Sequence, residues 1–248
     1  MQKLKGFFLF IILIYMAYFL RVSFYESYRI PTSHMLPTLF PGDYVFVNKF
    51  SYGLQLPFLG KIGARNLPEW GDIVVFEHPE NSDQMMISRI VGLPGQEVRF
   101  ENTYLALENI LASRPGIASA KDIKGLKAKD FPKGLERYHT KVDFYDSVEF
   151  HTLNQTELSL YNSDTVQIPE GKLFVLGDYR EIANDTRKIG LVDLESLVGR
   201  VDMIWFSCKK SLASIASFCD PFTIDWWRFP KKVDSYEPIL KKTQSEHN

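Results

Sequence analysis

The chain has 248 residues, of which 45% are hydrophobic and 14% are aromatic. This length and composition predict either one large β-rich domain or one domain with a sizeable insertion. The 29 basic and 30 acidic residues leave a formal net charge of −1. This charge balance argues against a nucleic-acid partner, which would favour a strongly basic surface.

The first predicted element is a membrane anchor. Residues 1–5 form a short tail that carries Lys3 and Lys5, and an uncharged apolar run follows from Gly6 to Leu20. The run is short for a span of about 20 residues, but residues 21–24 extend it because Arg21 can snorkel. No small-residue cleavage pattern follows, so residues 6–24 are interpreted as an uncleaved transmembrane helix rather than a signal peptide. The lysines favour a cytoplasmic N-terminus, with the rest of the chain outside the cytoplasm.

Strands are predicted next along the chain. Residues 44–50, 71–77 and 85–91 are rich in β-branched and aromatic residues, which is typical of strands. Residues 54–70 contain two prolines and two glycines and predict a loop. Gly92–Gly95 predicts a turn, after which residues 97–100 are expected to return as a hairpin partner.

The second half of the chain completes the predicted organisation. Residues 102–164 contain a lysine-rich stretch at 121–141 and are interpreted as an inserted subdomain with a solvated face. Residues 166–176 predict a strand, a turn and a strand, and residues 197–206 predict another strand. The closely spaced strands favour a mainly β, antiparallel fold with its core at 25–101 and 165–230 and a polar tail at 231–248.

Two features near the C-terminus have two interpretations each. Residues 225–229 (DWWRF) combine aromatic and basic side chains, as at a membrane interface, but core packing explains one of the tryptophans equally well. Cys208 and Cys219 are the only cysteines. They form either a disulfide in an oxidising compartment or two buried free thiols, and the sequence leaves both open.

Three motifs occur in order along the predicted core. They are IPTSHMLPTLFPGDYVFVNKFSYG at residues 30–53, MISRIVGLPGQ at residues 86–96 and GDYREIANDTRKIG at residues 177–190. In order and spacing they resemble the signature boxes of bacterial signal peptidase I, a family of membrane-anchored serine peptidases that cleave signal peptides from preproteins. The resemblance covers roughly residues 20–100 and 165–230. It implies a signal peptidase I-like fold in the bacterial inner membrane, and no cofactor.

The reactive side chains that the resemblance implies are substituted here. The family's nucleophilic serine corresponds to His34, and its general-base lysine corresponds to Ser88. A further family serine, which helps to hold the lysine, corresponds to Ala183. Thr32 matches a hydroxyl that helps to stabilise the tetrahedral oxyanion, so half of the oxyanion hole is retained.

The polar framework around these positions is retained. The residues that match it are Arg89, Gly177, Asp178, Arg180, Asp185 and Arg187. In the family, the carboxylate that matches Asp185 pairs with arginines that match Arg187 and Arg89. A structural ion pair that persists without the reactive groups indicates a scaffold that still folds and still binds.

Rearranged active sites remain open as alternatives. If positions 34 and 88 face each other as in the family, Ser88 can act as a nucleophile with His34 as its base, although the oxyanion donors near Thr32 are misplaced for that attack. Ser33 would serve only through a backbone bulge, because Ser33 and His34 point to opposite sides of an extended segment. The remaining histidines show no metal-like spacing, so no metal is expected; they are His78, His139, His151 and His247.

These observations lead to three hypotheses. The main one is a membrane-anchored relative of signal peptidase I without the usual Ser/Lys catalysis. It would bind the signal peptides of preproteins by strand addition, contact membrane lipid and pair with an active paralogue. The second is a working peptidase that uses Ser88 with His34, or Ser33. The third is a structural membrane protein with no role in export.

Overall fold

The computed structural model describes residues 6–8, 10–11, 13–15, 25–56, 60–62, 67–101, 104–107, 110–111, 113–119, 138–145, 148–155, 165–210, 219–224, 226 and 230–233. Every strand pairing recorded among these residues is antiparallel. The predicted mainly β, antiparallel fold is therefore confirmed.

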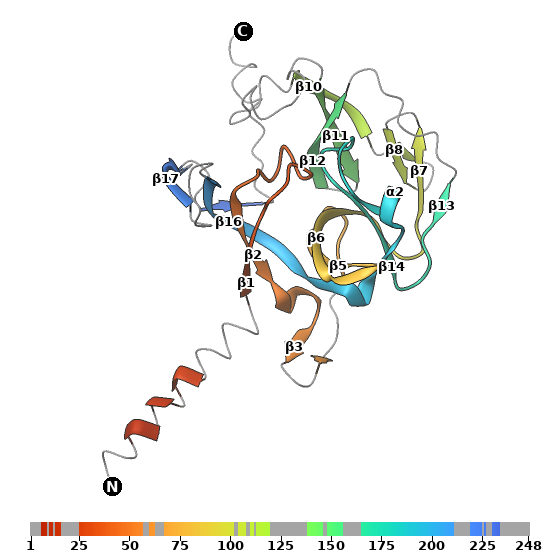
Figure 1. Ribbon diagram of the computed structural model, residues 1–248. Helices are drawn as coiled ribbons and strands as arrows, with labels where there is room; N and C mark the ends of the chain where they lie inside the picture. Colours follow the sequence, from red (N-terminus) through yellow and green to blue (C-terminus); the bar gives the residue numbers. More distant parts are fainter. Residues whose placement is uncertain are drawn as a thin grey trace, which may run out of the picture.

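The largest sheet has nine strands and contains all three motifs in or next to its strands. Its main path runs through β1 (Tyr25–Arg29), β2 (Asp43–Asn48), β16 (Leu197–Lys210), β5 (Ile73–His78), β6 (Asn81–Gly92), β14 (Lys172–Leu176) and β15 (Val192–Asp193). The strands β17 (Cys219–Ile224) and β18 (Lys231–Lys232) also pair with β16. Figure 1 shows β16 as the long strand that crosses the molecule and joins its two sides.

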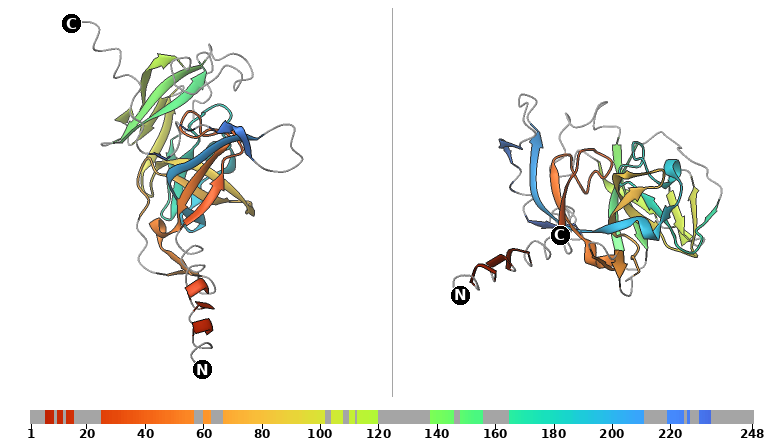
Figure 2. Two further views of the ribbon diagram at one scale, coloured as in Figure 1. Left: turned by 90° about the vertical axis from the view of Figure 1, so that its left-hand side faces the viewer. Right: turned by 60° about the horizontal axis from the view of Figure 1, so that its bottom comes forward.

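Three smaller sheets and three short helices complete the described fold of the core. The sheets are β13–β7–β8–β9, β10–β11–β12 and β3–β4. Their strands are β3 (Leu54–Leu56), β4 (Gly60–Ile62), β7 (Glu97–Glu101), β8 (Tyr104–Leu107), β9 (Ile110–Leu111), β10 (Ser113–Ser119), β11 (Tyr138–Tyr145), β12 (Val148–Gln155) and β13 (Val166–Gln167); the helices are η1 (Lys49–Tyr52), α2 (Thr186–Ile189) and η5 (Leu194–Ser196). Figure 2 shows β10–β12 at the end of the core far from the N-terminal helical residues.

The main sheet is covered by apolar side chains on both faces of β5. Ile73 and Val75 belong to one core cluster, whereas Val74 and Phe76 belong to another. These four side chains are at most 2% exposed. Because alternate residues of a strand point to opposite faces, a strand with core on both sides must be apolar at every position. This explains why residues 73–76 form a continuous apolar run.

The turn after β6 sends the chain into a different sheet. The predicted turn is confirmed at Gly95, whose φ of 83° favours glycine and whose N–H donates to the carbonyl of Ile168 at 2.8 Å. The prediction that residues 97–100 pair back onto β6 was wrong, because β7 pairs with β8 and β13. Val98 packs with Trp70 and Ile168 in a third core cluster, which draws β7 away from the main sheet.

Other predictions have mixed outcomes. Residues 54–70 were predicted as a loop, but they include the β3–β4 hairpin.

Cys208 is disulfide-bonded, and the chain has one other cysteine, Cys219. Trp226 is 70% exposed, whereas Trp227 and the tail after residue 233 lie outside the described residues. The division into anchor, core, insertion and tail stays a prediction.

The N-terminal segment is described only in part. Among the described residues, no helix reaches the length and hydropathy that a membrane crossing requires. The remaining residues of the predicted anchor at 6–24 lie outside the described part of the chain.

We expect the Phe76→Ala variant to lose about 3–5 kcal/mol in the free energy of unfolding, because truncating a buried aromatic side chain leaves a cavity. Phe76 is fully buried, whereas Phe50 is 48% exposed, so Phe50→Ala is the matched control and should lose much less. Urea unfolding of the full chain in detergent, followed by near-ultraviolet circular dichroism, measures both. Equal losses would show that β5 is not at the centre of the core.

Candidate functional site

The first part of the first motif, residues 30–42, forms a compact turn between β1 and β2. Hydrogen bonds close its base, from the N–H of Ile30 to the carbonyl of Asp43 and from the N–H of Gly42 to the carbonyl of Ile30, both at 2.8 Å. Within the turn, the N–H of Leu36 donates to the carbonyl of Ser33 at 3.1 Å. Met35, Leu36 and Leu39 are buried anchors. The segment that precedes them is therefore held firmly against the core.

Thr32, Ser33 and His34 lie at the start of this turn. Thr32 is exposed, and Ser33 and His34 are half-buried. The expectation of an extended segment was wrong, because residues 32–39 adopt turn and bend conformations. Ser33 and His34 therefore need not point to opposite sides of this backbone.

Gly177 joins the first and third motifs by close contact. The N–H of Tyr179 donates to the carbonyl of His34 at 3.0 Å. A Cβ at Gly177 would lie 2.8 Å from the His34 carbonyl oxygen and 2.4 Å from Cβ of Ala183. Real Cβ atoms do not approach that closely, so only glycine fits here. Positions 34, 177 and 183 are thus brought together.

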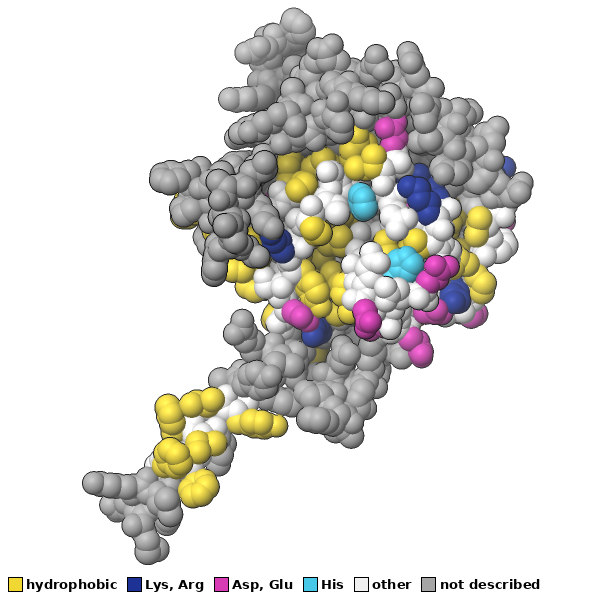
Figure 3. Space-filling model, in the orientation of Figure 1, with side chains coloured by type: hydrophobic (Ala, Val, Ile, Leu, Met, Phe, Trp, Pro, Cys, Tyr) yellow, Lys and Arg dark blue, Asp and Glu magenta, His cyan; other side chains and the backbone are white. Residues whose placement is uncertain are grey.

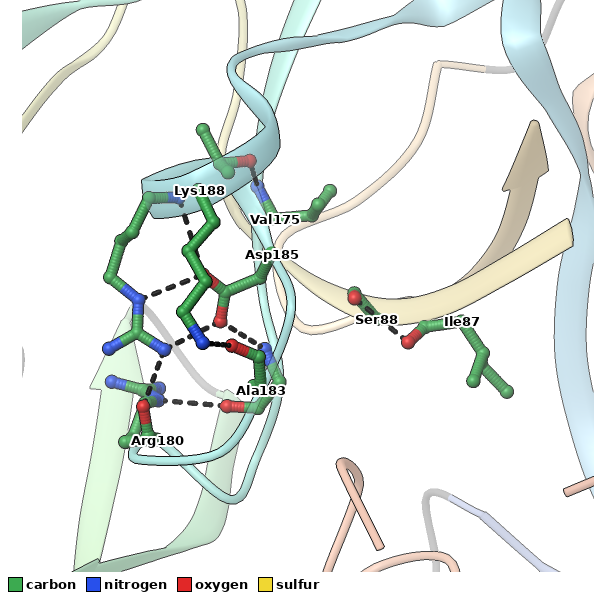
Figure 4. A network of polar contacts seen from close by, with 10 residues as sticks. Ile87, Ser88, Val175, Arg180, Ala183, Asp185 and Lys188 are labelled. Carbon is green, nitrogen blue, oxygen red and sulfur yellow. Dashed lines mark hydrogen bonds and ion pairs between the residues drawn. The ribbon is translucent and has the colours of Figure 1, made fainter. Parts of the chain in front are cut away.

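Ser88 lies on β6, the strand next to β14 in the main sheet. Its side chain is 1% exposed, and its hydroxyl donates to the carbonyl of Ile87 at 2.8 Å. In Figure 4, this hydrogen bond lies apart from the polar network around Asp185 and Lys188. Among the hydrogen bonds of the described residues, none joins Ser88 to His34. The described residues therefore lack the contact that a transposed dyad needs.

A buried ion pair holds the second motif to the third. The Arg89 guanidinium donates to Asp178 through Nε at 2.8 Å and through Nη2 at 2.7 Å, and through Nη1 to the carbonyl of Gly71 at 2.8 Å. Arg89 is 5% exposed and Asp178 is fully buried. The Thr38 hydroxyl from the first motif also donates to Asp178. This one carboxylate therefore links all three motifs.

A second ion pair shapes the third motif itself. The Arg187 guanidinium donates to Asp185 through Nε at 2.8 Å and through Nη2 at 2.7 Å. Asp185 also caps the N-terminus of α2 and accepts a hydrogen bond from the N–H of Gly177 at 3.0 Å. Arg180 donates through Nε to the carbonyl of Gly177 at 3.2 Å. The Asp185–Arg187 pair is as expected, but Arg89 was expected on Asp185, whereas the structure pairs it with Asp178.

Lys188 is a part of the site that the sequence reasoning missed. Its side chain reaches back from α2, and Nζ donates to the carbonyl of Ala183 at 2.8 Å. Figure 4 shows this side chain beside Asp185 and Ala183. The sequence carried one indication of this role. Lys188 directly follows Arg187 on a helix capped by Asp185, and both basic side chains return to the loop of the third motif.

The ring of His34 lies in a mixed electrostatic environment. Burial lowers the pKa of His34 below its usual value, the nearby Lys188 ammonium lowers it further, and Asp185 opposes them. A histidine in this position is neutral at neutral pH, so it carries one N–H donor and one acceptor nitrogen.

No metal ligand set is present in the part of the chain that the structure describes, because no three His, Cys, Asp or Glu side chains gather there. The ring of His78 instead accepts a hydrogen bond from the N–H of Glu80 at 3.1 Å. The side chains of His139 and His151, and all of His247, lie outside the described residues.

Comparison with known proteins gives a consistent picture. The profile of the family "Signal peptidase, peptidase S26" matches residues 4–206. The chain is 30% identical to signal peptidase I of Rickettsia akari over 222 residues, covering 85% of this chain and 77% of that protein. It is 32% identical to signal peptidase I of Rickettsia massiliae over 211 residues, covering 81% and 78%. It is 30% identical to signal peptidase I of Buchnera aphidicola over 251 residues, covering 84% and 78%.

Among solved structures, the chain is similar to a signal peptidase I from Enterococcus faecalis V583. The sequence identity is 27% and the TM-score is 0.34, and the match covers 56% of this chain and 99% of that one.

We expect the Asp178→Asn variant to lose about 3–5 kcal/mol in the free energy of unfolding, because it leaves the buried Arg89 charge without its counter-charge. The matched control is Asp193→Asn. Asp193 pairs with Lys172 at 2.6 Å, but their side chains are 53% and 37% exposed, and surface pairs contribute at most about 1 kcal/mol. Urea unfolding of the full chain in detergent compares the two. Similar small losses would mean that the Arg89–Asp178 pair does not hold the motifs together.

We also expect the Lys188→Gln variant to raise the pKa of His34, because removing a nearby positive charge stabilises the imidazolium. Nuclear magnetic resonance titration of ¹³C-labelled histidines measures this pKa, with a His34→Gln variant to assign the signal. Lys172→Gln changes a lysine on β14 whose carboxylate partner is Asp193, and it should leave the titration unchanged. An unchanged pKa in Lys188→Gln would show that Lys188 does not act on His34.

Proposed function

Because this chain belongs to the signal peptidase family, peptidase S26, we propose that it binds the signal peptides of preproteins but lacks the family's Ser/Lys catalysis. One contrast carries the proposal. The ion pairs Arg89–Asp178 and Asp185–Arg187 are fully formed, whereas the Ser88 hydroxyl donates to its neighbouring carbonyl. The scaffold of the site is thus intact where its reactive groups differ.

The chemistry of the side chains at these positions supports loss of the standard reaction. A serine nucleophile needs a base within hydrogen-bond reach. His34 stands at the proposed nucleophile position, and its lowered pKa favours a neutral ring. Ser88, at the proposed base position, has no side-chain basicity at neutral pH. Exposed Thr32 retains the hydroxyl of an oxyanion hole. Without a nucleophile, however, no tetrahedral oxyanion forms for this hydroxyl to stabilise.

An open strand edge supports peptide binding. Residues 85–88 of β6 pair with β5, and the pairing of β6 with β14 starts only at Arg89. Within the described part of the chain, the other edge of residues 81–88 carries no strand. An extended peptide can add to such an edge through main-chain hydrogen bonds. A peptide that follows this edge runs directly to Ser88.

The surface around the site suits an extended apolar ligand. Met85, on β6, is 43% exposed, and Ile182, in the third motif, is 42% exposed. Figure 3 shows hydrophobic side chains gathered in the middle of this face, with histidine and basic side chains beside them. Exposed apolar side chains beside a strand edge can contact alternate side chains of an added peptide.

The N-terminal residues support a membrane location. The described side chains between Phe7 and Tyr15 are helical and apolar, and Phe7, Phe10 and Tyr15 are 59%, 60% and 64% exposed. Such a surface is stable only against lipid or protein. Figure 1 shows these residues standing away from the β core. We place the helix in the bacterial plasma membrane and the β core on its outer side, where the chain would meet preproteins and an active paralogous peptidase.

We expect the purified full chain in detergent to bind a preprotein that carries an Ala-x-Ala site without cleaving it. Binding is measured by fluorescence anisotropy of a labelled signal peptide, and cleavage by gel electrophoresis. A genuine signal peptidase must cut the same substrate in parallel.

The same assay separates the alternatives. Cleavage by the parent that disappears in Ser88→Ala or Ser33→Ala would establish a rearranged serine peptidase and overturn the proposal. An absence of both binding and cleavage by a folded protein would instead favour a structural membrane protein.

A further inference from the structure

Lys188 has an ammonium group that the framework of the site does not use. Its side chain is exposed, and its Nζ has three donor hydrogens, of which one is directed to the carbonyl of Ala183. Among the ion pairs of the described residues, none includes Lys188. The ammonium is therefore fixed in place by a neutral carbonyl, with donors left for a ligand.

The acidic residue nearest to Lys188 in the sequence is Asp185, whose carboxylate is already paired with an arginine. Asp185 is fully buried and is held by the two nitrogens of Arg187 and by the N–H of Gly177. Asp178 is held in the same way by Arg89. Asp178 and Asp185 thus each have their own arginine, and Lys188 is in none of the ion pairs recorded among the described residues.

This charge lies beside His34, at the proposed nucleophile position. The N–H of Ala183 donates to the carbonyl of Tyr179 at 3.1 Å, and the N–H of Tyr179 donates to the carbonyl of His34 at 3.0 Å. This short series of backbone contacts fixes His34 relative to the carbonyl that holds Lys188. The neutral His34 ring adds one N–H donor, so two different donors lie where the scissile bond of a substrate would be expected.

We infer that His34 and Lys188 together bind a carboxylate, so that the site prefers a peptide that ends there with a free C-terminal α-carboxylate over an uncut chain. This inference rests on the proposed peptide-binding function. An uncut peptide bond is neutral and offers Lys188 only a carbonyl, whereas a carboxylate forms charge-assisted hydrogen bonds, which are about twice as strong. The ligand class is thus the released signal peptide, the product of cleavage by another enzyme.

The test uses three labelled peptides with one signal-peptide sequence. The first ends in a free carboxylate after the Ala-x-Ala motif, the second ends there in an amide, and the third continues uncut through the site. Binding to the full chain in detergent is measured by fluorescence anisotropy. We expect the acid peptide to bind about tenfold more tightly than the amide peptide, and the uncut peptide to resemble the amide.

Matched variants identify the residue responsible. Lys188→Met should abolish the preference for the acid peptide over the amide peptide, and Lys188→Arg should restore it. The control is Lys172, a lysine of β14 that forms an ion pair with Asp193. The Lys172→Met variant should keep the preference for the acid peptide. Equal binding of acid and amide peptides by the parent, or a preference that survives Lys188→Met, would overturn the inference while leaving peptide binding itself intact. If none of the three peptides binds, the proposed function fails as well.

Discussion

The carboxylate of Asp178 is the point on which the arrangement of the three motifs depends. It follows the C-terminal end of β14 (Lys172–Leu176), is fully buried, and accepts hydrogen bonds from Arg89 of β6 and from the Thr38 hydroxyl in the turn after β1. A buried charge of this kind is costly unless it is completely paired. These contacts therefore constrain three segments at once, and positions 34, 88 and 183 follow from that constraint.

The side chains at these positions are compatible with the fold because they leave the constraint intact. Asp178, Asp185 and their arginines contribute to stability, whereas a nucleophile and a base contribute only to a reaction. Ser88 satisfies its own hydroxyl on the adjacent carbonyl, and Ala183 fills the space against Gly177 with a methyl group. Neither residue leaves a buried polar side chain without a partner, which is the usual cost of altering a polar site.

The sequence predicted the antiparallel fold and most strands because their apolar and β-branched patterns are strong. It failed where local pattern and tertiary packing disagree. Residues 97–100 have the pattern of a hairpin partner, but packing of Val98 with Trp70 and Ile168 decides their sheet. Lys188 was missed because its position after Arg187 is a weak signal, and the return of its side chain to the loop before α2 depends on the folded backbone. The resemblance located the framework residues but assigned Arg89 to the wrong carboxylate, since two buried aspartates lie within one motif.

Within the described residues, one edge of β6 at residues 81–88 carries no strand, and this edge affects how copies of the chain can associate. An unpaired edge beside a hydrophobic face is a template for pairing between molecules, and natural sheets protect such edges with polar or charged residues. Residues 81–84 read Asn-Ser-Asp-Gln and are all exposed. They supply little apolar area to an incoming strand, so self-association along this edge gains mainly main-chain hydrogen bonds and is opposed by the repeated charge of Asp83. The polar residues at 81–84 therefore disfavour pairing between copies, and a strand that binds along this edge gains apolar contact only further along β6, where Met85 is exposed.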